Sequence, residues 1–138
     1  MKYILNEKLA LRSWNDYTYA LLVSKGVHSI KLKKKQFDIL LKCDGQTELD
    51  ENIPELSSLL KSKIVQEAQN GQILSEWQKH KFCNNPYKAG VDFRITGRCN
   101  FNCKHCFNAA DMNLDHNQWK MSEVNKLLDE AVDCGLQY

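Results

Sequence analysis

The stretch RITGRCNFNCKHCFNAADM, residues Arg94 to Met112, holds three of the chain's six cysteines within eight positions, at Cys99, Cys103 and Cys106. On a helix, positions i, i+4 and i+7 share one face, so the thiols could belong to a buried stripe. A loop is favoured instead, because Gly97, Asn100 and Asn102 are poor helix formers. We therefore expect a polar loop that wraps three thiols around a common centre.

The ligand set favours an iron–sulfur cluster over zinc. Thiolates select zinc or iron–sulfur clusters, and three thiols with one open position suit a cluster whose fourth iron is left for a substrate. A structural zinc usually takes four protein ligands, and His105 is the one histidine close enough to serve as the fourth. Because His105 directly precedes Cys106, the two side chains diverge in an extended loop and cannot easily reach one ion.

The residues around the loop predict one β/α unit. Residues Gly90 to Thr96 alternate apolar and polar and form a strand that runs into the loop. Residues Met121 to Gly135 form an amphipathic helix, with Ser122 as N-cap and Gly135 as the C-cap signal. A strand, a loop and a helix in this order start a parallel α/β sheet.

The first half of the chain predicts a separate module. Strands are expected over residues 8–14, 18–23 and 27–32, followed by a helix that ends near Gly45 and a second helix from Pro54 to Ala68. A short strand through Ile73 and Leu74 would close a winged-helix-like α+β domain. The segment Ser75 to Ala89 has mixed charge and an Asn-Asn-Pro turn, which indicates a linker. We place the domains at residues 1–77 and 90–138, with the linker at 78–89.

Composition limits the location and the partners. The chain has 138 residues, of which 43% are hydrophobic, and a net charge of +2. Its longest apolar run, Ala20 to Val23, is too short to cross a bilayer, and no signal peptide is evident. We expect a cytoplasmic protein without a nucleic-acid or membrane partner. In that compartment clustered thiols more often bind metal than form disulfides.

The sequence CNFNCKHC, at the end of a predicted strand and before a predicted helix, resembles the Cys-x-x-x-Cys-x-x-Cys signature of radical S-adenosylmethionine (SAM) enzymes, and Phe107 matches the aromatic residue that follows it. The resemblance implies that the three thiolates bind three irons of a 4Fe–4S cluster and that SAM chelates the fourth. An electron from a donor such as ferredoxin or flavodoxin then yields a 5′-deoxyadenosyl radical, so the implied activity is that of an oxidoreductase. It also places His105 and Phe107 near the SAM adenine.

In that family the next strand leads to a Gly-Gly-Glu-like motif, which this sequence does not contain. We therefore expect an N-terminal fragment, with only the first β/α unit of a partial barrel, that does not catalyse alone. Residues 1–77 are similar in layout to the winged-helix element that recognises precursors in enzymes modifying ribosomally made peptides. That similarity implies a leader peptide added to a sheet edge, where the basic run from Lys31 to Lys35 could attract an acidic leader. The alternative is a zinc-stabilised winged-helix binding module without catalysis.

Overall fold

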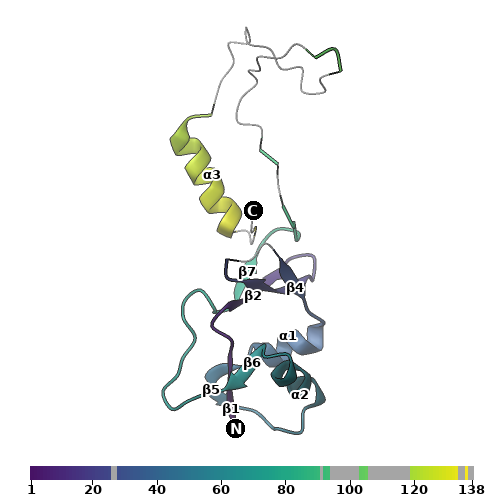
Figure 1. Ribbon diagram of the computed structural model, residues 1–138, viewed down its shortest axis with the longest axis vertical. Coiled ribbons are helices and arrows are strands. Elements are labelled where there is room, and N and C mark those ends of the chain that lie inside the picture. Colours follow the sequence, from purple (N-terminus) through teal and green to yellow (C-terminus); the bar gives the residue numbers. More distant parts are fainter. Residues whose placement is uncertain (26–27, 91, 94–102, 106–118, 134–135, 137–138) are drawn as a thin grey trace.

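The computed structural model describes residues 1–25, 28–90, 92–93, 103–105, 119–133 and 136 (Figure 1). These residues form two β-sheets and three helices, so the chain is a mixed α+β protein. No closed barrel is present in this described part. None of the helices found there has the length and apolar character needed to span a bilayer.

The first sheet has three antiparallel strands in the order β5-β1-β6. They are β1 (Lys2–Leu5), β5 (Asp44–Glu48) and β6 (Val65–Glu67). The central strand β1 is absent from the sequence prediction. Its residues Tyr3, Ile4 and Leu5 are all buried, so the strand lacks the alternation that marks a half-exposed one.

The second sheet has four strands in the order β4-β3-β2-β7. They are β2 (Leu9–Trp14), β3 (Tyr19–Val23), β4 (Ser29–Lys31) and β7 (Lys81–Cys83). The predicted antiparallel meander is confirmed by the pairing of β2 with β3 and of β3 with β4. In addition, β7 pairs with β2 in parallel.

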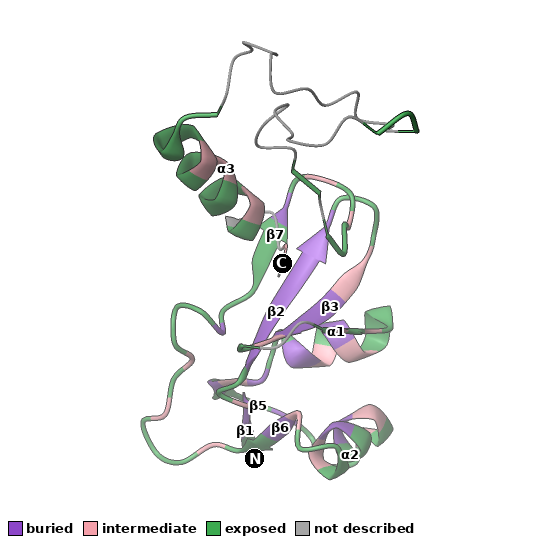
Figure 2. Ribbon diagram, turned by 45° about the horizontal axis from the view of Figure 1, so that its top comes forward, coloured by how far each residue is buried: buried purple, intermediate pink, exposed green. Residues whose placement is uncertain are grey.

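Both faces of β2 are buried, which Figure 2 shows as continuous purple along the strand. Leu9 and Leu11 join the larger hydrophobic cluster, which also contains residues of β1, α1 and α2. Ala10 and Trp14 belong to a smaller cluster together with Cys83 of β7. The alternation of successive side chains therefore connects two cores through one strand.

Helix α1 spans Lys34–Leu40 and has its C-cap at Leu41. The expectation that Gly45 ends this helix is wrong, because Gly45 lies inside β5. It still needs to be glycine, since its φ is +80° and an added Cβ would lie 2.3 Å from the carbonyl oxygen of Gln72.

Helix α2 spans Pro54–Lys61, with proline in the first turn as predicted. The helix is shorter than expected, because Lys63 takes a φ of 56° and Val65 already belongs to β6. The predicted strand through Ile73 and Leu74 is also wrong, since both residues lie in an irregular segment. The apolar residues after Lys61 therefore serve a strand and a loop, although their spacing imitates a helix.

Residues 75–87, which we call the docked segment, pack against the N-terminal sheets although most of them were expected to form a linker. Besides the β7 pairing, the buried Gln78 donates a hydrogen bond from Nε2 to the Leu5 carbonyl at 2.9 Å. The guanidinium of Arg12 donates to the carbonyls of Lys79 at 2.9 Å and of Trp77 at 3.2 Å. Backbone carbonyls that would be free in a linker are thus satisfied by Arg12 of β2, and the Gln78 side chain is satisfied by β1.

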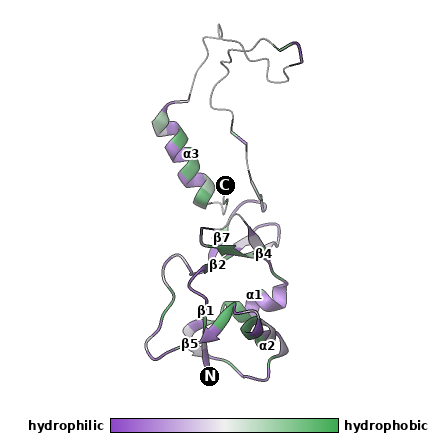
Figure 3. Cartoon of the chain, in the orientation of Figure 1, coloured by the Kyte–Doolittle hydropathy of each residue, from purple (hydrophilic) through white to green (hydrophobic). Residues whose placement is uncertain are grey.

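Helix α3 spans Met121–Asp133, which confirms the predicted amphipathic helix (Figure 3). Ser122 is not the N-cap, because the helix starts one residue earlier and the Glu123 carboxylate accepts a hydrogen bond from the Lys120 backbone N–H at 2.8 Å. Gly135 lies outside the described residues. Of the strand predicted over 90–96, residues Gly90, Asp92 and Phe93 are described and are not in a strand.

Candidate functional site

The predicted cluster ligands are only partly described. Cys103 is an exposed free thiol, and it is followed by the exposed residues Lys104 and His105 in a turn. Cys99, Cys106 and Phe107 lie outside the described residues. The convergence of three thiols, and the contact of His105 and Phe107 with SAM, therefore stay predictions.

The other two described thiols belong to the cores. Cys43 is fully buried, and its Sγ donates to the Ile39 carbonyl at 3.4 Å. Burial, and secondarily the charge of Asp44, raises the pKa of the Cys43 thiol to about 12, so this group is protonated at neutral pH. Cys83 is 3% exposed within the smaller cluster. Neither thiol is placed to bind a metal from solvent.

No three His, Cys, Asp or Glu side chains come together as a metal site within the part of the chain that the structure describes. His80 already has a hydrogen-bond partner, since its Nε2 lies 2.7 Å from Ser13 Oγ. Its ring also packs edge-on against Phe37. Burial, followed by the nearby charge of Arg12, lowers the pKa of His80 below 6.5, so the ring is neutral at pH 7.

Strand β4 has a free edge, as a peptide-binding strand requires. Among the described residues it pairs with β3 only, and Leu32 just beyond it donates its N–H to the Tyr19 carbonyl at 2.8 Å. Hydrogen-bonded and non-hydrogen-bonded pairs alternate along antiparallel strands, so the backbone N–H and C=O groups of Ile30, like those of Leu32, point toward β3. The N–H and C=O groups of Ser29 and Lys31 therefore point away from β3, toward the open edge.

Tyr87 ties this edge strand to the docked segment. Its hydroxyl lies 2.7 Å from Ser29 Oγ, and Lys31 Nζ lies 4.9 Å from the centre of its ring. The ring meets Trp14 edge-on at a centroid distance of 4.9 Å, and its backbone N–H donates to the Asp16 carboxylate at 3.0 Å. The chain that leads toward the cysteine stretch is thereby anchored to β2 and β4.

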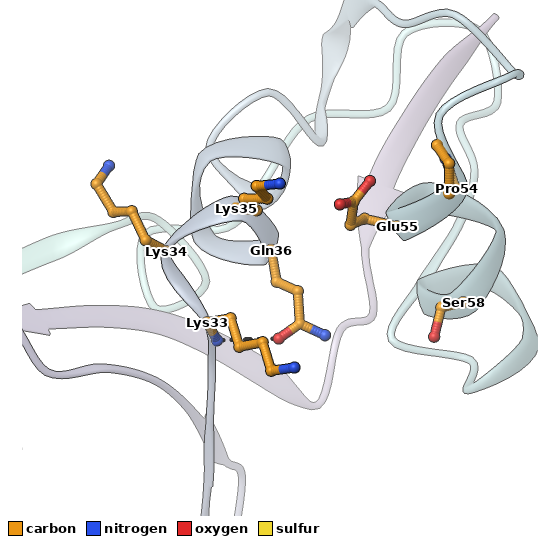
Figure 4. A pocket seen from close by; sticks show the side chains of 7 residues that line it. All are labelled: Lys33, Lys34, Lys35, Gln36, Pro54, Glu55 and Ser58. Atoms are coloured by element: carbon orange, nitrogen blue, oxygen red, sulfur yellow. Dashed lines mark hydrogen bonds between the residues drawn. The ribbon is translucent and has the colours of Figure 1, made fainter.

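A groove opens between the first turns of α1 and α2, with a volume of about 630 Å³ (Figure 4). We call it the α1–α2 groove; it is lined by Lys33, Lys34, Lys35, Gln36, Pro54, Glu55 and Ser58. The lysine run from Lys33 to Lys35 was recognisable in the sequence as a candidate for attracting acidic peptide. The sequence carried no sign that residues of α2 form the opposing wall, because only tertiary packing brings the two helices together.

Sequence reasoning missed Tyr87 as well. Its only local sign was its position in the Asn-Asn-Pro-Tyr turn, which was interpreted as part of a linker.

The comparisons with known proteins add no further guide: no protein-family model, no curated protein and no solved structure matches this chain. Assignment of a function therefore rests on the thiol spacing, the free sheet edge and the groove.

Proposed function

We propose that the chain belongs to a radical SAM enzyme in which Cys99, Cys103 and Cys106 hold a 4Fe–4S cluster. The observation that carries the proposal is the spacing of the three thiols in a polar stretch. When bound, the cluster and SAM supply a 5′-deoxyadenosyl radical that abstracts hydrogen from the substrate.

The described part of the site fits this donor set. Cys103 is exposed and free, whereas the buried Cys43 and Cys83 are committed to hydrophobic cores. Lys104 lies next to Cys103 and is exposed, so its charge offsets part of the negative charge that thiolate ligands introduce. His105 and Phe107 flank Cys106 and would border the cofactor.

The N-terminal part has its own role in the proposal. Residues 1–77 form a winged-helix-like recognition domain that binds the precursor of a ribosomally made peptide as an added strand on β4. The free N–H and C=O groups of Ser29 and Lys31 support this role, because strand addition takes its affinity from main-chain hydrogen bonds. The anchoring of Tyr87 holds this edge in a defined relation to the chain that leads toward the thiols.

Anaerobic reconstitution of the chain with ferrous iron and sulfide tests the cluster. We expect about four irons per chain and a brown protein with broad visible absorption. Replacing any one of Cys99, Cys103 and Cys106 by alanine should abolish this iron content, because two thiolates cannot hold three irons. Cys134→Ala is the matched control and should keep it.

The opposite results would assign the chain differently. Full iron content in any of the three single variants would refute the ligand set. Tight, stoichiometric zinc in aerobically purified protein, without iron uptake, would instead identify a zinc-stabilised binding module.

A further inference from the structure

We propose that the α1–α2 groove binds the acidic side chains of the peptide that pairs with β4. The inference deepens the proposed peptide-recognition role and rests on it. It specifies the chemistry of the partner: an extended peptide with carboxylates beyond the segment that pairs with the sheet.

The free polar groups of the groove are almost all hydrogen-bond donors. Among the described residues, Lys33 and Lys35 have no ion-pair partner. The Gln36 side-chain oxygen accepts the Lys33 backbone N–H at 2.9 Å, which leaves its amide N–H groups for a ligand. The Ser58 hydroxyl has no hydrogen-bond partner among the described residues; the Ser62 hydroxyl donates to the Ser58 backbone carbonyl instead. This donor set matches carboxylate oxygens.

The charge of the groove favours an anion. Three lysines line it against one carboxylate, that of Glu55. Lys34 forms an ion pair with Asp38, so Lys33 and Lys35 remain against the single carboxylate of Glu55, and the lining keeps a net positive charge. Figure 4 shows Lys35 and Glu55 on facing helices. Because Glu55 is negatively charged, it would repel an acidic side chain that enters the groove.

The position of the groove connects it to the peptide edge. Lys33 is two residues beyond the last residue of β4. A chain that pairs along β4 and continues past its end by two residues advances about 7 Å. In this proposal, the same peptide uses main-chain bonds at β4 and, past the end of that strand, side-chain charges at the groove.

A nucleic acid is a poorer match for the groove. Its lining contains no aromatic side chain on which a base could stack. The whole chain has a net charge of +2, far from the strongly basic character of nucleic-acid-binding surfaces. An acidic peptide accounts for both the donors and the neighbouring free edge.

Fluorescence anisotropy with the whole chain tests the inference. The probe is a short fluorescein-labelled peptide of alternating Glu and Val, and its counterpart carries Gln at every Glu position. We expect the Glu peptide to bind more tightly than the Gln peptide and to lose that advantage as salt is added, because exposed charges are screened.

Three substitutions and one control locate the site. Lys33→Gln and Lys35→Gln should each weaken binding of the Glu peptide about two- to fivefold. Glu55→Gln should tighten binding by a similar factor, because it removes the one carboxylate among the described residues that line the groove. Lys61→Gln, at the other end of α2, changes the same net charge outside the groove and should have no effect. Circular dichroism on each variant checks that the fold is retained.

Equal binding of the Glu and Gln peptides would overturn the inference, and so would an unchanged or weakened affinity of Glu55→Gln. Tighter binding of a short oligothymidylate than of the Glu peptide would identify a nucleic-acid site instead. Iron content of the same preparation is measured separately. Binding of the Glu peptide without iron uptake would refute the cluster and retain the groove as a peptide site. Iron uptake without preferential binding of the Glu peptide would refute the groove alone.

Discussion

Two glycines with the same positive φ provide a matched test of the N-terminal fold. Gly45 and Gly71 both have a φ of +80°. A Cβ at Gly71 would have no atom within 4 Å, whereas a Cβ at Gly45 would lie 2.3 Å from the Gln72 carbonyl oxygen and 3.3 Å from Ile4 Cδ1. Alanine at both positions therefore shares the conformational penalty and differs in the contact.

The expected magnitudes follow from these distances. The left-handed conformation costs an alanine about 1–2 kcal/mol, and Gly71→Ala should lose this amount only. Gly45→Ala must in addition displace the backbone at Gln72, and it crowds the side chain of Ile4, which is 2% exposed in β1. Overpacking of this kind costs a further ~1–3 kcal/mol, so the total is about 2–5 kcal/mol. That is a large part of the stability of a small domain, which is typically about 5–15 kcal/mol.

Urea unfolding followed by circular dichroism measures both variants against the parent chain. We expect the free energy of unfolding to be lower for Gly45→Ala than for Gly71→Ala by about 1–3 kcal/mol, with unchanged denaturant slopes. Equal losses for the two variants would refute the close approach of β5 to Gln72. A larger loss for Gly71→Ala would refute the open surroundings of that residue.

Further tests address the histidine, the sheet edge and the thiols. Because burial lowers the pKa of His80, the unfolded chain binds a proton that the folded chain does not, so the free energy of unfolding should fall as the pH drops below 6.5. Urea titrations at several pH values should show a weaker pH dependence for His80→Gln. The same pH dependence in both proteins would contradict a buried, neutral His80. Lys31→Pro should weaken peptide binding more than Lys31→Gln, because proline also removes the backbone N–H that points to the open edge. Ile30→Pro instead removes a hydrogen bond to β3 and should lower the free energy of unfolding. Equal peptide binding by the two Lys31 variants would exclude strand addition. Iodoacetamide under native conditions should alkylate Cys103 and leave Cys43 intact by mass spectrometry, and modification of both at similar rates would contradict the burial of Cys43.

Several features of the fold were predictable because they depend on residues close together in the chain. The meander from β2 to β4 follows from runs of apolar residues separated by turn residues, and α3 follows from an amphipathic stripe. The proposed metal site likewise depends on a local pattern, the spacing of Cys99, Cys103 and Cys106, and its geometry lies outside the described residues. Local periodicity was misleading where a helical stripe ran past Lys61 into β6, because spacing does not reveal where a positive φ turns the chain.

Tertiary structure alone decided which distant segments meet. Strand β1 became the centre of a sheet because β5 and β6, whose paired residues are forty or more positions away in sequence, pair with its two edges. The polar segment 75–87 became part of the fold because Arg12 and Asp16 satisfy its backbone groups and the Leu5 carbonyl accepts a hydrogen bond from the Gln78 side chain. The lysine run became one wall of a groove only when α2 packed against α1. In each case the deciding partner is remote in sequence, and a residue's own neighbours carry no signal of which remote backbone or side chain will satisfy it.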